Sequence, residues 1–196
     1  MIAKVKMNSS IKATIAYCCK SAKDATVIAC NGTTGQVDTQ LLIKQFQGQA
    51  DQRPDLKNKI MHIIISHSPE DTLKLSEINE QKIMSDYIQR LARGKGKNEG
   101  LDLFQTQFVA IRHNDKGHVH YHLLANMVDN NGERLKDSNI GYKAKSASID
   151  ITKEHGLTRA ISKELRHEIE TKIQSKPIEV KIQSEQTRIR GFGPKR

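Results

Sequence analysis

The sequence predicts an α+β fold, an antiparallel sheet of about five strands with helices packed mainly on one face. Short β-branched segments alternate with segments whose apolar residues recur at helical spacing. Residues 59–66 are apolar on both faces, as expected of a central strand. Residues 103–112 and 118–128 are separated by a short turn that suits an antiparallel hairpin. We therefore place this hairpin in the centre of the sheet.

The N-terminal part contains two predicted strand and helix pairs. Residues 1–7 alternate apolar and polar positions, which predicts an edge strand, and the polar residues 8–10 can cap a helix over 11–20. The β-branched run 26–30 predicts the next strand, and the apolar spacing in 37–47 predicts the second helix.

Further helices are expected on either side of the hairpin. In residues 76–91, apolar positions recur at helical spacing, with acidic side chains early and basic ones late. The segment 93–100 is rich in glycine and lysine and is expected to be a flexible basic loop. Residues 142–155 form another predicted helix, which glycine ends.

The 196 residues suffice for one domain with an extension. We expect a main domain over residues 1–158 and a helical, basic extension over 159–196. Within that extension, residues 159–174 have helical spacing. The polar end is expected to be partly disordered, or a junction to further domains.

The composition narrows the class of protein. With 32 Lys and Arg against 22 Asp and Glu, the formal charge is +10, which favours polyanionic partners such as nucleic acid. Three cysteines, with Cys18 and Cys19 adjacent, exclude a disulfide framework and favour the cytoplasm. The apolar runs, such as residues 63–65, are far too short to span a membrane. The few aromatic residues argue against an aromatic platform for single strands.

Four of the eight histidines lie in ten residues of the predicted hairpin. Alternate residues of a strand share a face, so His118, His120 and His122 point the same way. His113 ends the partner strand, close enough to bind one divalent ion with His120 and His122. Imidazole ligands suit Mn, Fe, Co, Ni or Zn better than Mg, and three ligands leave positions open for substrate. Asp115 lies in the turn.

The histidine spacing resembles that of the relaxase family of conjugative and mobilisable elements, in particular the HUH-type nucleases of the MOBP group. Their motif, H-x-D-x-x-H-x-H-x-H followed by Asn, is filled by His113, Asp115, His118, His120, His122 and Asn126. The resemblance implies that His113, His120 and His122 bind the metal. It assigns no role to His118.

Two further segments resemble the same family, and together the resemblance covers about residues 1–158. The segment MHIIISHSPED is similar to a motif in which a histidine opens a strand and a Ser-Pro-acidic turn closes it, which makes His62 and Glu70 additional candidates. His62 can equally be a strand histidine with an ordinary packing role. The family places a nucleophilic tyrosine in or after the first helix, and Tyr17 occupies that place.

The chain has four tyrosines. Tyr87 lies on the apolar stripe of its helix, and Tyr121 faces away from the histidines on its strand. Tyr142 follows a glycine at a predicted helix start and remains an alternative. The family resemblance favours Tyr17 as the catalytic nucleophile.

The resemblance implies a bacterial, plasmid-type DNA relaxase that nicks one strand at a transfer origin. Tyr17 would attack the scissile phosphate, give a 5′-phosphotyrosine intermediate, and use a divalent metal, Mn, Mg or another first-row transition ion. Asp115 is expected to orient a histidine or to assist proton transfer. Single-stranded or supercoiled DNA, accessory mobilisation proteins and a coupling protein are the expected partners.

Several basic residues are candidates for contacts with the DNA backbone. They are Lys20, Lys23, Arg93, Lys95, Lys97, Arg112, Lys143 and Lys145. On the predicted architecture, the sheet face opposite the helices would hold the DNA.

Three other functions remain open at this stage. A rolling-circle replication initiator shares the histidine pair and the tyrosine chemistry, although the extended histidine motif and the early tyrosine favour a relaxase. A non-enzymatic, metal-containing DNA-binding module would need closed Cys and His ligation, and the cysteines lie far from the histidines in sequence. A metal-dependent hydrolase would need no tyrosine.

Overall fold

The computed structural model describes residues 1–20, 24–75, 77–95, 98–115, 117–158 and 171. The elements, in chain order, are β1 (Ile2–Asn8), α1 (Ile11–Cys18), β2 (Thr26–Asn31), α2 (Thr39–Ala50), β3 (Ile60–Ser66), α3 (Pro69–Thr72), α4 (Glu77–Arg93), β4 (Gly94–Lys95), β5 (Asn98–Glu99), the 3-10 turn η2 (Leu103–Gln105), β6 (Thr106–His113), β7 (His120–Asp129) and α5 (Ile140–Glu154).

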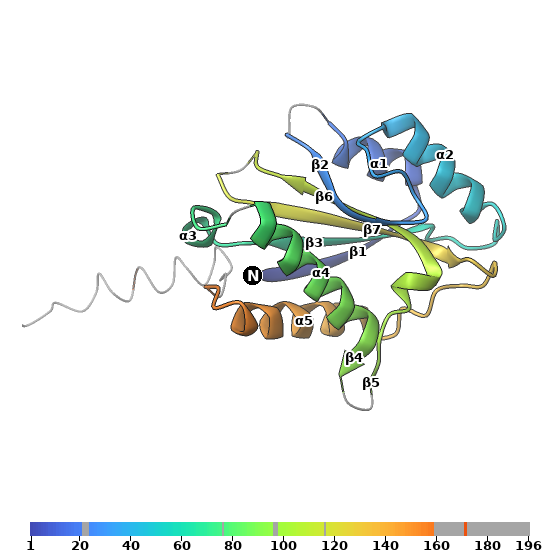
Figure 1. Cartoon of the computed structure of the whole chain (residues 1–196). Coiled ribbons are helices and arrows are strands. Elements are labelled where there is room, and N and C mark those ends of the chain that lie inside the picture. The colour runs from blue at the N-terminus through green and yellow to red at the C-terminus, as the bar shows by residue number, and fades with distance from the viewer. Residues whose placement is uncertain (21–23, 76, 96–97, 116, 159–170, 172–196) are drawn as a thin grey trace, which may run out of the picture. The chain divides into compact units, whose positions relative to one another are not determined.

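Five strands form one antiparallel sheet in the order β1-β3-β7-β6-β2 (Figure 1). The expected hairpin is β6 and β7, and β7 is the middle strand. β3 pairs on both sides, as its two apolar faces predict, and β1 lies at an edge. The predicted five-stranded antiparallel sheet is therefore confirmed.

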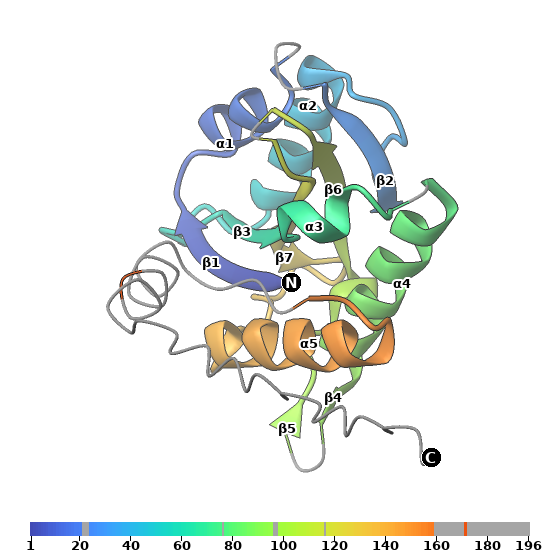
Figure 2. The same cartoon turned by 90° about the vertical axis from the view of Figure 1, so that its left-hand side faces the viewer.

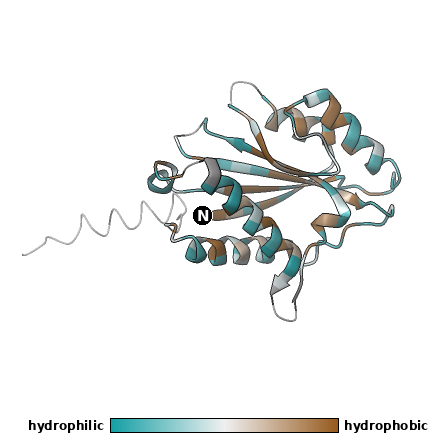
Figure 3. Cartoon of the chain, viewed as in Figure 1, coloured by the Kyte–Doolittle hydropathy of each residue, from teal (hydrophilic) through white to brown (hydrophobic). Residues whose placement is uncertain are grey.

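One face of the sheet is covered by α4 and α5 (Figures 1 and 2). Tyr121 and Leu123 of β7 point into this layer, which also contains Tyr87 of α4 and Ile151 of α5. Each of these four side chains has no exposed surface. Figure 3 shows hydrophobic residues along the strands and hydrophilic residues along much of α4. Burial of this apolar layer is the main stabilising contribution to the fold.

The opposite face is covered in part by α1 and α2, so the helices are divided between both faces rather than gathered mainly on one. Ile15 of α1 and Phe46 of α2 pack there against Val109 and Ile111 of β6 and Leu124 of β7. The physical reason is that the central strands carry apolar residues on both faces, and both sets must be removed from water. This second face also carries His113, His120 and His122 and is called the histidine face.

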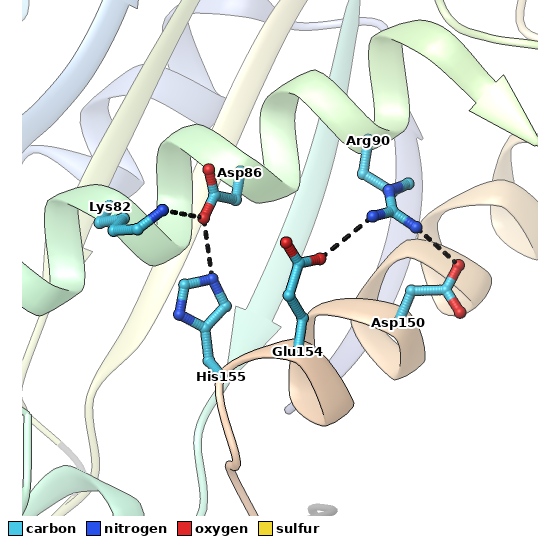
Figure 4. Close-up of polar contacts among 6 residues, drawn as sticks. All are labelled: Lys82, Asp86, Arg90, Asp150, Glu154 and His155. Carbon is cyan, nitrogen blue, oxygen red and sulfur yellow. Dashed lines mark hydrogen bonds and ion pairs between the residues drawn. The ribbon is translucent and has the colours of Figure 1, made fainter.

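Charged side chains join α4 to α5 at the surface (Figure 4). The Asp86 carboxylate lies 2.8 Å from Lys82 Nζ and 2.9 Å from His155 Nε2. Arg90 contacts Asp150 at 3.4 Å and Glu154 at 3.1 Å. The hydrogen bond from Lys82, followed by that from His155, lowers the pKa of Asp86. Exposed pairs of this kind each contribute little to stability.

Two further expectations concern segments outside the main sheet. The expected basic loop over 93–100 contains a short antiparallel pair, β4 with β5, so it is partly ordered by backbone hydrogen bonds. The chain divides into two compact units, residues 1–160 and 161–196. The expected helix over 159–174 and the polar end lie outside the described residues, apart from residue 171. None of the described helices is long and apolar enough to cross a membrane.

Candidate active site

The β6–β7 hairpin brings three of the predicted histidines together. His113 and His120 are directly opposite each other in the register, and His122 lies two residues further along the same face of β7. The ring centroids of His113 are 5.2 Å from His120 and 4.4 Å from His122. All three side chains are buried, and one ligand atom from each lies within 4.8 Å of the others. This group can hold one metal ion.

Hydrogen bonds set the orientation of two of these rings. His113 Nε2 lies 2.6 Å from the Cys18 carbonyl oxygen, which can only accept, so Nε2 carries the hydrogen and Nδ1 has the lone pair. His122 Nδ1 lies 2.6 Å from His62 Nε2, so Nε2 of His122 is the atom turned to a metal. His62 is therefore part of the site, through His122. Partners of this kind commonly orient metal-binding histidines.

His120 is oriented from the turn between the two strands. Its Nε2 lies 3.4 Å from Asp115 Oδ1, and its Nδ1 lies 3.3 Å from the His118 carbonyl oxygen. Burial, partly offset by the hydrogen bond that His120 donates to the His118 carbonyl, lowers the pKa of His120. The neutral imidazole is the form that binds metals, so burial favours a ligand. The three nitrogen donors thus fit a first-row transition ion, with positions left for substrate.

Tyr17 lies beside this group, at the C-terminal end of α1. Its ring is edge-on to that of His122, with centroids 5.9 Å apart. The residue is 42% exposed, although its neighbour Cys18 is fully buried. Ser10 caps α1 through Ala13 N, and Ile15 anchors the helix against the sheet. The packed helix therefore carries an accessible phenol beside three buried imidazoles.

The other three tyrosines, all within the described part of the chain, lie elsewhere. Tyr87 and Tyr121 are fully buried in the layer formed by the sheet with α4 and α5. Their hydroxyls donate to Ala144 O and to Glu80 Oε2, respectively. Burial raises the pKa of both phenols. Tyr142 is 71% exposed, on α5, which packs on the face opposite the histidines. Among the four, Tyr17 is the one whose ring lies beside the three histidines.

A groove of about 510 Å³ opens beside Tyr17. It lies between β1, α1, β3 and the segment before β3, and Lys6, Lys57 and His62 contribute to its wall. Sequence reasoning did not single out Lys6 or Lys57. The alternation of residues 1–7 carries a signal for Lys6, because Lys4 and Lys6 share one face of β1. Only the pairing of β1 with β3, which sets Lys6 opposite His62, connects that face to the site.

Three other candidates lie outside the ligand group. His118 is in the turn before β7, with its ring 5.6 Å from that of His120. Asn126 is fully buried, and its amide donates to the carbonyl oxygen of Phe46, which ties α2 to the sheet. Glu70 is exposed on α3.

The basic candidates are dispersed. Lys20 is exposed just after α1, near Tyr17 in sequence. Arg112 lies on the opposite face of β6 from His113, paired with Glu80 at 2.5 Å. Arg93 lies at the end of α4, Lys95 in β4, and Lys143 and Lys145 in α5. Lys23 and Lys97 lie outside the described residues.

None of the three cysteines, all within the described part of the chain, forms a disulfide. Cys18 is fully buried in α1, and its sulfur lies 4.0 Å from His62 Nε2. It therefore belongs to the site's surroundings, which sequence reasoning did not predict. The sequence did hold one indication of this position, because Cys18 directly follows Tyr17.

Residues 17–157 match the family described as "Relaxase: MobA/VirD2-like, nuclease domain". No curated protein sequence matches the chain. Three solved structures of the conjugative relaxase TrwC with oriT DNA are similar in structure, in metal-free, metal-bound and copper-bound forms. Their identities are 13%, 15% and 13%, with TM-scores of 0.47, 0.46 and 0.47. Each match covers 83% of this chain and 73%, 73% and 74% of the other.

Proposed function

We propose that this chain, which belongs to the relaxase family of MobA/VirD2-like nuclease domains, nicks one DNA strand at the transfer origin of a plasmid or related element. The observation that carries the proposal is the exposed phenol of Tyr17 beside three buried histidines whose ligand atoms lie within 4.8 Å of one another. A metal-bound phosphate and a tyrosine nucleophile can meet at such a site.

The proposed reaction is a transesterification. The Tyr17 oxygen bonds to the scissile phosphorus, the bond to the 3′-oxygen breaks, and a 3′-hydroxyl leaves with a proton. The DNA then remains joined to Tyr17 by its 5′-phosphate. A divalent metal held by His113, His120 and His122 would neutralise the non-bridging phosphate oxygens.

The residues around the histidines have positioning roles in this proposal. His62 holds the ring of His122 through the 2.6 Å contact between their nitrogens. The His118 carbonyl holds Nδ1 of His120 and leaves Nε2 for the metal, so Asp115, 3.4 Å from Nε2, would assist proton transfer at the site. The carbonyl of Cys18 holds His113, so the helix that carries Tyr17 also aligns a ligand. Nucleophile and metal site are thus coupled through α1.

The DNA path in the proposal follows the histidine face. Lys6 and Lys57 line the groove beside Tyr17, where ammonium groups can neutralise backbone phosphates without reading bases. The formal charge of +10 supports fast approach to DNA. Accessory mobilisation proteins and a coupling protein would act with the chain at the transfer origin.

The test is a search for a covalent adduct. The protein is incubated with Mn²⁺ and a supercoiled plasmid that carries the DNA flanking its gene, and products are separated under denaturing conditions. We expect nicked DNA with a protein-linked 5′ end, mapped by mass spectrometry to Tyr17. The Tyr17→Phe variant should form no adduct, whereas Tyr142→Phe, a matched change at an exposed tyrosine, should form it normally. Nicking without any adduct, or an adduct retained in Tyr17→Phe, would refute the mechanism.

A further inference from the structure

A second group of potential metal ligands lies directly beneath Tyr17. Cys18, His62 and His122 each offer one ligand atom, and these three atoms lie within 4.8 Å of one another. All three side chains are buried, and they come from α1, β3 and β7. The cluster shares His122 with the three-histidine group. It adds a sulfur donor that the three-histidine group does not have.

We propose that Cys18, His62 and His122 form a separate site for a thiophilic divalent cation of the zinc class, whose occupancy antagonises the three-histidine site. One thiolate and two imidazoles form a donor set typical of zinc, and thiolate ligands select against Mn²⁺ and Mg²⁺. The two sites therefore differ in the ions they prefer. The proposed antagonism rests on the proposed function of the three-histidine site, whereas the ligand cluster does not.

The contacts already present show how an ion would enter. His62 Nε2 and His122 Nδ1 lie 2.6 Å apart, with a hydrogen between them, and Cys18 Sγ lies 4.0 Å from the same His62 nitrogen. Tetrahedral zinc, with bonds to nitrogen of about 2.0 Å, needs ligand nitrogens about 3.3 Å apart. A side-chain adjustment of less than about 1 Å therefore opens the site. The cation would replace the hydrogen between the two rings, and this proton and the thiol proton would both pass to solvent.

The antagonism follows from the two nitrogens of one imidazole. Nδ1 of His122 faces His62, so Nε2 is the nitrogen that serves the three-histidine group. A cation on Nδ1 withdraws electron density from Nε2 and places a like charge near the second ion, which weakens binding there. Cys18 also follows Tyr17 in sequence, and its carbonyl holds His113. An ion on the Cys18 thiolate would therefore also act on the C-terminal end of α1, which carries Tyr17 and the carbonyl that holds His113.

The other two cysteines of the chain serve as controls for Cys18. Cys19 is also buried and adjacent in sequence, but its thiol contacts Thr39 of α2 rather than the histidines. Cys30 is exposed on β2, outside both ligand groups found among the described residues. The effect of Cys18→Ser can therefore be compared with that of Cys19→Ser, which removes a neighbouring buried thiol.

The site is tested by adding Co²⁺, a spectroscopic substitute for zinc, to the full chain in the absence of DNA. The expected signal is a thiolate-to-cobalt charge-transfer band in the near ultraviolet for the wild type, Cys19→Ser and His113→Ala. Cys18→Ser, Cys18→Ala and His62→Ala should lack it, with circular dichroism to confirm that each variant is folded. No band in the wild type, or an equal band in folded Cys18→Ser, would overturn the site.

The antagonism is tested by titrating Zn²⁺ into Mn²⁺-supported nicking. Because Zn²⁺ also competes directly for three histidines, the informative quantity is the half-inhibitory concentration in each variant. We expect it to rise about tenfold or more in Cys18→Ser and Cys18→Ala, relative to the wild type and Cys19→Ser. Equal values would show that all inhibition arises at the three-histidine site and would overturn the antagonism. Absence of nicking by the wild type without zinc would overturn the proposed function and the antagonism together, while the cobalt band still decides the site.

Discussion

The two faces of the sheet differ in what they bury, although the same strands supply both. On β7, His120 and His122 point to the histidine face, and Tyr121 and Leu123 point to the layer formed with α4 and α5. That layer is closed and mostly apolar, whereas the histidine face is open to the groove beside Tyr17. A strand period of two thus places one set of residues at the candidate site and the other in the closed layer.

The two faces also treat their phenols differently. Tyr87 and Tyr121 are buried and donate hydrogen bonds within the closed layer, where burial raises their pKa and disfavours the phenolate. Tyr17 keeps 42% of its surface exposed on the histidine face. Exposure to solvent therefore separates the candidate nucleophile Tyr17 from the two buried tyrosines.

The largest expected effect comes from His122→Ala. This change removes a ligand from the three-histidine group, and we expect nicking to fall on the order of 10³-fold. Metal binding, measured by calorimetry, should weaken in parallel. The free energy of unfolding should also fall, by about 1–3 kcal/mol, because a buried ring and its hydrogen bond to His62 are lost, so nicking is compared at a temperature where the variant remains folded. Nicking near the wild-type rate would remove His122 from the site.

Leu123, adjacent to His122, is expected to affect stability rather than nicking. Leu123→Ala leaves a cavity in the closed layer, so the free energy of unfolding should fall by about 2–5 kcal/mol. At a temperature where the variant remains folded, nicking should stay within about threefold of the wild type, since Leu123 points away from the histidines. Urea unfolding and nicking assays on the same preparation measure both. A large loss of nicking by a folded variant would contradict the division of roles between faces.

The next prediction concerns how His67 makes the free energy of unfolding depend on pH. This residue is buried against Tyr121, and within the described part of the chain neither of its ring nitrogens has a hydrogen-bond partner. Burial, followed by the Met1 amino group, lowers its pKa from 6.5 to about 4, and Asp71 opposes this shift. His118 also faces it and lowers the pKa slightly.

A base with a lowered pKa binds fewer protons when folded, so its contribution to stability is full above pH 6.5 and falls as the pH drops toward 4. The shift of about 2.5 units corresponds to about 3 kcal/mol. In His67→Phe, the fall in unfolding free energy between pH 7 and pH 4 should be smaller than in the wild type by up to this amount. Urea titrations at several pH values provide the comparison, and parallel pH profiles would exclude the role of His67.

The smallest effect is expected at the surface contacts between α4 and α5. Arg90→Ala removes the pairs with Asp150 and Glu154, at 3.4 Å and 3.1 Å, both partly exposed to water. Exposed pairs contribute about 0.2–1 kcal/mol each, and salt screens them. Thermal unfolding should therefore shift only slightly, and less at high salt. A shift as large as that of Leu123→Ala would show that these contacts, rather than the apolar layer, hold α5 in place.

The sequence by itself determined the sheet elements and most of the site. The spacing of His113, His120 and His122 depends on strand period and on one hairpin, both local properties, so their convergence could be predicted. The placement of Tyr17 required the family resemblance, because no local pattern joins it to histidines over a hundred residues away. The helices on both faces were not predicted, since apolar runs show that a strand is buried but not which helix buries it.

The tertiary structure alone decided the surroundings of the site. Pairing of β1 with β3 sets Lys6 opposite His62, and packing of α1 brings Cys18 to 4.0 Å from His62 and its carbonyl to His113. It also pairs Arg112, on the opposite face of β6 from His113, with Glu80 of α4. These contacts join segments separated by tens of residues, and they depend on helix docking and strand order. Local periodicity assigns each side chain to a face, but only packing determines which neighbours share it.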